Sequence, residues 1–159
     1  MEKPWLNEYD ANVPHSIEYP SAPLWQFLVD AAKKHPNNAA IVFGNVVEPL
    51  GNALMDTSIN YATLLQWTYR FAAALQKLGV QKGDRVALHL PNCPQFVISF
   101  WSLLAAGAIV VNLNPLYTPD ELKSVFQMTG MTGLITFDMV LPNVRAVLKD
   151  YEVPLVIVT

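Results

Sequence analysis

The sequence predicts an α/β domain in which strands and helices alternate around a mainly parallel sheet. Short apolar runs rich in β-branched residues occur at 86–90, 108–113, 133–137 and 155–159. A segment with helical spacing of its apolar residues, or with helix-start and helix-stop signals, separates each run from the next. Strands that alternate with helices in this way pair in parallel through right-handed crossovers.

The N-terminal part should consist of an arm and the start of the domain. Residues 1–22 are rich in Pro, Tyr and Asn without a steady period, so we expect an irregular arm that precedes a partial α/β domain at 23–159. Pro23 suits the first turn of a helix whose apolar residues recur at helical spacing up to a stop at residues 35–36. A short strand at 39–43 should then lead into a hairpin or loop.

The helix that the sequence predicts in most detail starts at Tyr61. Asn60 precedes it, and an Asn side chain accepts hydrogen bonds from first-turn amides. Gly79 follows it, where a left-handed residue commonly ends a helix. The apolar stripe of this helix comprises Tyr61, Leu64, Leu65, Phe71, Ala72, Leu75 and Leu78. One face of the helix should therefore pack against the core.

A helix end and a strand meet at Gly107. The preceding helix is expected over 94–106, and the glycine should end it. The run AIVVNL at 108–113 is apolar almost throughout. Such a run is typical of a strand that is buried on both faces of a parallel sheet.

Thr118 marks the start of the next helix. Pro119 suits the first helical position, and Glu121 stands three residues after Thr118, which is the spacing of a capping box. This helix should continue to residue 128 or 129. A further helix is expected at about 140–149.

The composition limits the classes of function. Of the 159 residues, 52% are hydrophobic and 14% are charged, whereas about 25% are charged in a typical soluble domain. The net charge of −3 comes without a basic block, so we expect no nucleic-acid partner. Cys93 is the only cysteine, which excludes an internal disulfide, and no secretory signal is visible. A cytoplasmic location is the resulting expectation.

An uncharged stretch raises the question of membrane contact. Residues 86–119 contain no Asp, Glu, Lys or Arg, and 96–111 read FVISFWSLLAAGAIVV. A spanning helix needs about 20 apolar residues, and Gly107 divides this shorter run into a helix-like half and a Val/Ile-rich half. We favour a buried helix followed by a buried strand over membrane insertion, and peripheral membrane contact is left open.

The sequence closes on an apolar strand. The run LVIVT at 155–159 has no polar tail, whereas natural chain ends are usually exposed. We therefore expect the sequence to be a piece of a larger protein.

Motif spacing indicates no catalytic, cofactor-binding or metal-binding residue. The seven glycines are scattered singly, so no phosphate-cradling motif is formed. His15, His35 and His89 lack Cys or His partners at metal-ligand spacing. His89 lies near a strand end, but a histidine satisfied by neighbouring backbone is preferred over a catalytic one. Cys93 stands at a helix start without an evident base that would make it a nucleophile.

Four aromatic residues, Trp67, Tyr69, Phe100 and Trp101, lie in the predicted helices. They could line a fatty or aromatic pocket, but packing in a core or an interface is the preferred interpretation. The residues by themselves thus indicate a scaffold with little chemistry.

The central run of the chain resembles a known family. Residues 57–122 read TSINYATLLQWTYRFAAALQKLGVQKGDRVALHLPNCPQFVISFWSLLAAGAIVVNLNPLYTPDEL. They combine a Tyr-started helix, the turn KGDRVAL, the element LPNCPQF and the stretch AAGAIVVNLNPLYTPDEL, in this order. The run resembles the N-terminal region of AMP-forming acyl-CoA synthetases, which belong to the adenylate-forming superfamily. The opening KPWLNEYDANVPHSIEYPSAPL is similar to the N-terminal arm of long-chain fatty-acid CoA ligases.

The resemblance implies an activity for the parent protein. Members of the family convert a fatty acid and ATP to an acyl adenylate with the help of magnesium, release pyrophosphate, and transfer the acyl group to coenzyme A. Their phosphate loop, nucleotide contacts, magnesium-binding Glu and adenylation Lys follow the region seen here, so Lys77, Lys82 and Lys123 receive no catalytic role. We expect this chain alone to be an inactive scaffold without a cofactor of its own, with the remainder of the ligase chain as its partner.

A second hypothesis is a standalone, non-enzymatic interaction or oligomerisation module derived from the same fold. Its N-terminal arm and exposed aromatic residues would pair with another subunit. In either case, unpaired sheet edges and uncovered apolar faces predict self-association.

Overall fold

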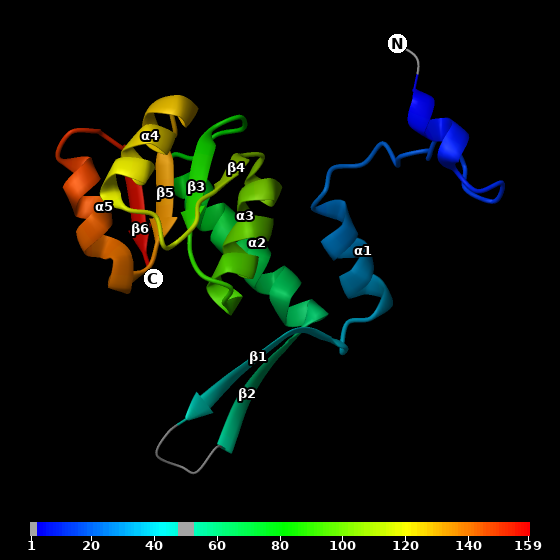
Figure 1. The fold of residues 1–159 in the computed structure, drawn as a ribbon. Helices are drawn as coiled ribbons and strands as arrows, with labels where there is room; N and C mark the ends of the chain where they lie inside the picture. Colours follow the sequence, from blue (N-terminus) through cyan, green and yellow to red (C-terminus); the bar gives the residue numbers. More distant parts are fainter. Residues whose placement is uncertain (1–2, 48–52) are drawn as a thin grey trace.

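The computed structural model describes residues 3–47 and 53–159 and contains a three-layer α/β/α body (Figure 1). Its central sheet has four parallel strands in the order β4-β3-β5-β6. These strands are β3 (Arg85–His89), β4 (Ile109–Asn112), β5 (Gly133–Thr136) and β6 (Leu155–Val158). The predicted fold class is therefore confirmed.

Two pairs of helices cover the two faces of this sheet (Figure 1). One face carries α2 (Tyr61–Lys77) and α3 (Pro94–Ala106), and the other carries α4 (Pro119–Thr129) and α5 (Leu141–Leu148). A single 3-10 turn, η2 (Asp138–Val140), leads into α5. Because successive strand residues point to opposite faces, each strand supplies side chains to both layers.

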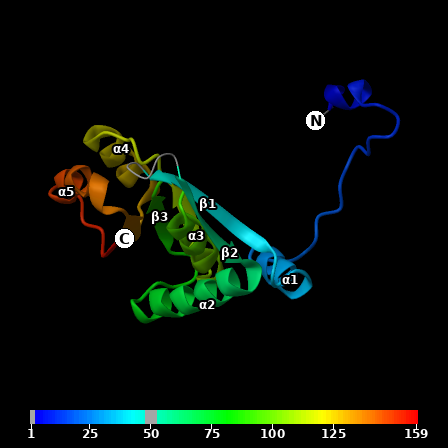
Figure 2. The same cartoon turned by 90° about the horizontal axis from the view of Figure 1, so that it is seen from below.

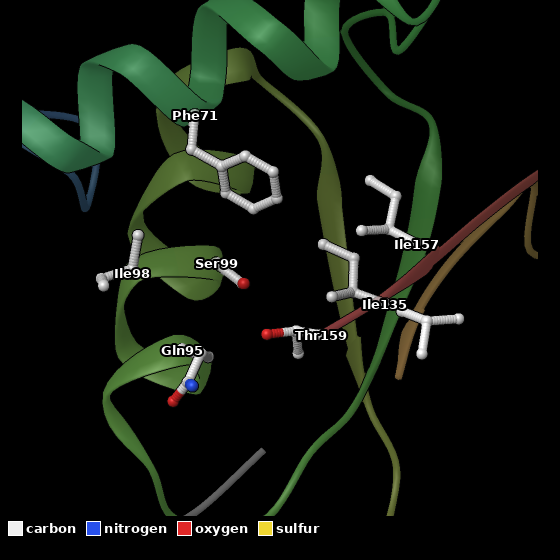
Figure 3. A pocket seen from close by; sticks show the side chains of 8 residues that line it. Phe71, Gln95, Ile98, Ser99, Ile135, Ile157 and Thr159 are labelled. Atoms are coloured by element: carbon white, nitrogen blue, oxygen red, sulfur yellow. The ribbon is translucent and has the colours of Figure 1, made fainter. Parts of the chain in front are cut away.

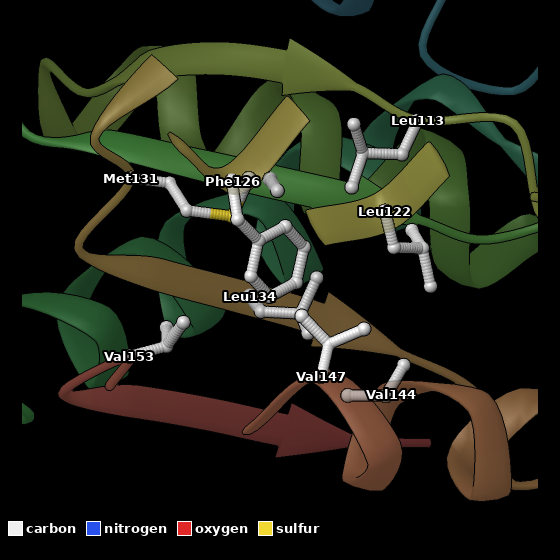
Figure 4. Packing of buried hydrophobic residues seen from close by; sticks show 9 residues of the cluster. Leu113, Leu122, Phe126, Met131, Leu134, Val144, Val147 and Val153 are labelled. Carbon is white, nitrogen blue, oxygen red and sulfur yellow. The ribbon is translucent and has the colours of Figure 1, made fainter. Parts of the chain in front are cut away.

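The described residues form three apolar core clusters, and the four-stranded sheet separates the two larger ones. Figure 4 shows the cluster beneath α4 and α5, in which the ring of Phe126 lies against Leu134 of β5. The buried members of this cluster are Ala87, Leu113, Leu122, Phe126, Met131, Leu134, Val144, Val147 and Val153. The cluster on the opposite face contains Leu75, Val80, Val86, Leu88, Leu90, Leu103, Ala108 and Ile135. Adjacent residues of one strand, such as Leu134 and Ile135, thus fill different layers.

The local signals predicted from the sequence appear in the structure. The Asn60 side chain accepts a hydrogen bond of 2.8 Å from the amide of Thr63 at the start of α2. Gly107 ends α3 in the left-handed conformation, with φ at 84°. Thr118 and Glu121 form the capping box of α4, in which the Thr118 amide donates to Glu121 Oε2 at 2.8 Å.

The expectation that β4 is buried on both faces is wrong. β4 lies at the edge of the four-stranded sheet, and Ile109 at its start is 50% exposed. The strand buried throughout is β5, because it has a neighbouring strand on each side and helices on both faces. An apolar composition indicates that a strand tends to be buried, but it does not predict whether the strand lies at the edge or in the middle of the sheet.

The N-terminal elements lie outside the four-stranded sheet, and Leu28 of the first helix packs against Leu64 of α2. A 3-10 helix, η1 (Pro4–Glu8), interrupts the arm that was expected to be irregular, and α1 (Gln26–Lys34) follows. The predicted short strand is longer in the structure: β1 (Ala39–Val47) pairs antiparallel with β2 (Ala53–Asn60) in a separate two-stranded sheet. This hairpin meets α2 at the start of that helix (Figure 1). The connection between its strands lies outside the described residues.

Candidate functional site

The connectivity of the sheet creates a switch point between β3 and β5. From β3 the chain passes to β4 on one side and then crosses to β5 on the other side. The loops that leave β3 and β5 therefore diverge toward opposite helical layers. In open α/β sheets, ligands bind at such a point, just outside the carboxyl ends of the strands. The carboxyl ends of β3 and β5 are the candidate site by topology.

A buried histidine and a threonine face each other at this switch point. His89 and Thr136 are the last residues of β3 and β5, they pair in register, and both are fully buried. The His89 Nδ1 lies 3.1 Å from Thr136 Oγ1, so the two side chains share a hydrogen bond. The His89 Nε2 has no hydrogen-bond partner among the described residues.

The environment of His89 favours its neutral form. Burial lowers the pKa of His89 below its usual value of 6.5, and the nearby backbone carbonyls of Asn114 and Pro115 oppose this effect only in part. A neutral imidazole at this position joins two strands and carries no positive charge toward an anionic ligand. The sequence predicted that backbone groups would be the hydrogen-bond partners of His89, but its partner in the structure is the Thr136 side chain.

An apolar cavity of about 280 Å³ opens beside the carboxyl ends of β5 and β6 (Figure 3). Side chains from α2, α3 and the two strands line it: Phe71, Gln95, Ile98, Ser99, Ile135, Ile157, Val158 and Thr159. In Figure 3 the Ser99 and Thr159 oxygens and the Gln95 amide lie on one side of the opening, and Phe71 lies at the other end. The lining of the cavity is therefore mainly apolar with a few polar groups, as is common in small-molecule sites.

A second apolar cavity adjoins the first on the same side of the sheet. It measures about 400 Å³ and is lined by Phe43, Thr57, Ile59, Trp67, Pro94, Gln95 and Ile98. Gln95 and Ile98 line both cavities. We call the two together the apolar trough; it runs from the β1–β2 hairpin along α2 and α3 to the end of β6.

The aromatic residues considered from the sequence divide between the trough, the core and the surface. Trp67 lines the trough and is 38% exposed. The rings of Phe100 and Trp101 meet edge to face, with 5.6 Å between their centroids, and both pack against core clusters. Tyr69 is exposed and contacts Trp25 edge to face. Cys93 is the half-buried N-cap residue of α3, and its side chain makes no capping hydrogen bond.

The lysines that received no catalytic role lie away from the trough lining. Lys123 on α4 forms a surface ion pair with Asp150, at 2.9 Å between Nζ and Oδ2. The hydrogen bond and the charge of Asp150 raise the pKa of Lys123. Lys77 lies in the last turn of α2, and Lys82 lies beside Gly107.

The described residues show neither a metal-binding cluster nor a membrane-spanning helix. Within 3–47 and 53–159, no group of three or more His, Cys, Asp or Glu side chains is arranged to hold a metal ion. None of the helices in the described part of the chain combines the length and apolar character needed to cross a membrane.

Sequence reasoning missed the trough as a site. Phe71 was recognised only as part of the apolar stripe of α2, and Ile135 and Ile157 only as strand residues. Three elements, α2, β5 and β6, bring these side chains together, and that arrangement depends on strand order. The polar strand-end residues His89 and Thr136 signal the switch point and line no part of the trough.

The fold and the switch point define a class: an α/β protein built to present ligands or partners at the carboxyl edge of a parallel sheet. A family model described as AMP-binding enzyme matches residues 28–159. The chain belongs to the AMP-binding enzyme family. The resemblance to AMP-forming acyl-CoA synthetases is thereby confirmed.

Two similar proteins are long-chain-fatty-acid–CoA ligases. The long-chain-fatty-acid–CoA ligase of Bacillus subtilis (strain 168) is 40% identical over 142 residues, which are 89% of this chain and 23% of the relative. The ligase of the same name from Salmonella typhimurium is 35% identical over 164 residues, covering 100% of this chain and 27% of the relative. The chain thus spans about a quarter of the length of these curated relatives.

Solved structures agree with this relationship. The chain superimposes on a long-chain-fatty-acid-CoA ligase from Archaeoglobus fulgidus with a TM-score of 0.81 and 28% identity, covering 96% of this chain and 30% of that chain. The N-terminal domain of FACL13 from Mycobacterium tuberculosis matches with a TM-score of 0.66 and 26% identity, over 85% of this chain and 33% of that one. The fold therefore matches part of the N-terminal domain of acyl-CoA ligases.

Proposed function

We propose that this chain is the N-terminal scaffold of a long-chain fatty-acid CoA ligase. The observation that carries this proposal is the 40% identity with the Bacillus subtilis ligase over 89% of the chain. The TM-score of 0.81 with the Archaeoglobus fulgidus ligase supports the same assignment at the level of the fold.

The reaction of the complete enzyme has two steps. A fatty-acid carboxylate attacks the α-phosphorus of ATP, and the bond to the β-phosphate breaks, so that an acyl adenylate and pyrophosphate form. The coenzyme A thiol, after losing its proton, then attacks the acyl carbon, and AMP leaves. ATP, magnesium and coenzyme A are therefore the proposed cofactors and cosubstrates of the parent enzyme, with a fatty acid as its substrate.

The residues of this chain have a structural part in that enzyme. The His89–Thr136 hydrogen bond joins the two strands at the switch point, and the capping box at Thr118 fixes the helix that follows β4. The described residues that line the trough are mostly apolar, with only Gln95, Ser99 and the threonines as polar groups. We assign the trough to contact with the remainder of the ligase chain, because apolar side chains predominate in its lining and it ends at β6, an edge strand with a neighbouring strand on one side only.

A chimaeric enzyme tests the proposal. This chain replaces the matching segment of the Bacillus subtilis ligase, and ATP–pyrophosphate exchange is measured with and without a long-chain fatty acid. The chimaera should catalyse exchange that depends on the fatty acid, whereas the isolated 159-residue chain should catalyse none. A chimaera that is folded by circular dichroism but inactive would overturn the assignment, and exchange by the isolated chain would overturn the scaffold role.

A pair of substitutions in the chimaera tests the part assigned to the trough. Ile98→Asp places a charge between the two cavities and should lower the exchange rate. Met139→Asp makes the same kind of change at a residue that is exposed and lines no part of the trough, and it should leave the rate near that of the parent chimaera. Equal rates for the two variants would contradict the assigned contact.

The location of the enzyme is a separate expectation. A cytoplasmic location with peripheral membrane contact stays a prediction from the sequence, and fractionation of cells that produce the protein would test it.

A further inference from the structure

A tight turn at residues 114–117 lies between β4 and α4, at the carboxyl end of the sheet. The Asn114 carbonyl accepts a hydrogen bond from the Tyr117 amide at 3.1 Å, and the Asn114 side-chain oxygen accepts one from the Leu116 amide at 3.0 Å. Asn at the first position and Pro at the second, here Pro115, are typical of β-turns. The turn is therefore closed by hydrogen bonds within its own four residues.

Both ends of this turn are anchored, whereas its tip faces solvent. Before the turn, Leu113 is buried and its amide donates to the Leu88 carbonyl of β3 at 2.9 Å. After the turn, Tyr117 packs against the cluster of Figure 4, and Thr118 belongs to the capping box of α4. Leu116 at the tip is 85% exposed. An apolar side chain is thus held outward on a turn that is fixed at both ends.

The buried His89 lies between this turn and β5. β3 has β4 on one side and β5 on the other, so Thr136 approaches the imidazole from one side and the residues that follow β4 approach it from the other. Nδ1 faces Thr136 Oγ1 at 3.1 Å. The backbone carbonyls of Asn114 and Pro115 are near enough to raise the pKa of His89 against the larger effect of burial. His89 is therefore the side chain of β3 that reaches the base of the turn.

These surroundings decide which ring nitrogen of His89 carries the proton. Nε2 is fully buried and has no partner at hydrogen-bonding geometry among the described residues. With the proton on Nδ1, the Nε2 lone pair would be left facing carbonyl oxygens, and an unsatisfied buried group is costly. With the proton on Nε2, the N–H faces the negative ends of the carbonyls, and the Thr136 hydroxyl donates to Nδ1. The second arrangement gives each polar atom of the ring a favourable neighbour.

We propose that His89, as a neutral imidazole protonated on Nε2, is a positioning residue that holds the turn at 114–117, and that this turn presents Leu116 to the remainder of the ligase chain. The remainder is the expected partner, because the chain spans about a quarter of the length of its curated relatives and the turn stands at the edge of the sheet where ligands and partners approach. The contact of Leu116 rests on the proposed function, whereas the role of His89 in the turn does not.

NMR spectroscopy of the 159-residue chain with ¹⁵N-labelled histidine tests the position of the proton. The ring nitrogens are observed at a pH above the ordinary histidine pKa of about 6.5, where a protonated and a bare nitrogen have clearly different chemical shifts. His89 should show a protonated Nε2 and a bare Nδ1. A protonated Nδ1 with a bare Nε2 would overturn the arrangement, and this measurement needs no substitution that could disturb folding.

Two substitutions of His89 separate its contact with the turn from its contact with Thr136. His89→Gln has an amide N–H that reaches about as far as Nε2, whereas His89→Asn is shorter and keeps only a group near Nδ1. Exchange of the Leu116 and Tyr117 amides with solvent should be about fivefold faster in His89→Asn, since one polar contact of the turn is lost, and near wild type in His89→Gln.

The Thr63 amide, which is bonded to Asn60 at the start of α2, is the internal control. Its exchange should not change in either variant, so that a general loss of stability is recognised. Equal exchange of the turn amides in the two variants would show that His89 does not position the turn.

The chimaeric ligase tests the contact that Leu116 makes. Leu116→Ser should lower the fatty-acid-dependent exchange of ATP and pyrophosphate by at least about fivefold, because it truncates an apolar contact. The control Met139→Ser changes a residue that is 82% exposed on the turn that follows β5, and it should leave the rate near that of the parent chimaera. His89→Asn should also lower the rate, and combining it with Leu116→Ser should add little, because both act through one turn.

The outcomes distinguish this inference from the proposed function. Equal rates for Leu116→Ser and Met139→Ser in an active chimaera would overturn the Leu116 contact and leave the ligase assignment standing. A folded but inactive parent chimaera would overturn the ligase assignment and the Leu116 contact with it. The NMR measurements on the 159-residue chain decide the role of His89 in either case.

Discussion

The substitution Phe126→Ala tests how the layer formed by α4 and α5 is held on the sheet. Phe126 is fully buried in the cluster shown in Figure 4. Its ring meets Tyr151 edge to face, with 5.6 Å between the centroids and an angle of 70° between the planes. The substitution removes the aromatic pair and leaves a cavity between α4 and β5.

The expected loss follows from these contacts. A buried Phe→Ala change costs about 3–5 kcal/mol of unfolding free energy, and loss of an edge-to-face pair accounts for about 0.5–1.5 kcal/mol. We expect a loss of about 4 kcal/mol, which is a large fraction of the roughly 5–15 kcal/mol by which domains are stable. With a urea dependence of about 2 kcal/mol per molar, the unfolding midpoint should fall by about 2 M.

Urea unfolding followed by far-UV circular dichroism measures this loss. Two controls separate burial from other effects. Met128→Ala changes an exposed residue of the same helix and should shift the free energy by less than about 0.5 kcal/mol. Tyr151→Phe keeps the ring pair and should also be mild. A loss below about 1 kcal/mol for Phe126→Ala would refute this description of the packing.

Three further predictions concern local structure and pH. Thr118→Ala removes the capping box and should cost about 1 kcal/mol of unfolding free energy, more than Ser124→Ala in the same helix; equal urea midpoints would contradict the capping role. Gly107→Ala and Gly79→Ala should each cost about 1–2 kcal/mol in backbone strain, because both glycines have positive φ. Gly107→Ala should lower the thermal midpoint further, since its Cβ would lie 3.1 Å from a lysine side-chain atom whereas Gly79 faces open space; a larger shift for Gly79→Ala would show this reasoning to be wrong. Finally, burial lowers the pKa of His89 in the folded state below its ordinary value of 6.5. At pH values between the folded-state pKa and 6.5, the unfolded chain therefore binds more protons at His89 than the folded chain does. Stability is therefore full above pH 6.5 and declines as pH falls from there toward the lower folded pKa, and His89→Gln should flatten that decline in urea titrations at several pH values; an unchanged slope would refute it.

The helix boundaries were largely predictable from the sequence because their signals are local. Asn60, Gly107 and the Thr118–Glu121 pair act within one turn of the chain, through hydrogen bonds and backbone conformation that neighbouring residues determine. Pro94 to Ala106 was predicted as a helix with the boundaries that the structure has. The alternation of strands and helices followed from the same signals, and with it the fold class.

The burial of individual strands was not predictable in the same way. The sequence favoured burial on both faces for AIVVNL, yet β4 is an edge strand and GLIT of β5 is the strand buried throughout. Both runs are apolar, so composition does not distinguish them. The number of neighbouring strands distinguishes them, and it depends on the order of strands in the sheet.

The site shows the same division between local and tertiary information. By itself the sequence determined the fold class, the helix caps and the family resemblance, because these depend on residues that are close together along the chain. The tertiary structure alone decided that His89 meets Thr136, which is 47 residues away in the sequence, that Phe71, Ile135 and Ile157 share one cavity, and that the arm is held away from the body (Figure 2). The physical reason is that strand order and layer packing are set by the sum of many weak contacts between distant segments, and no short stretch of sequence contains that sum.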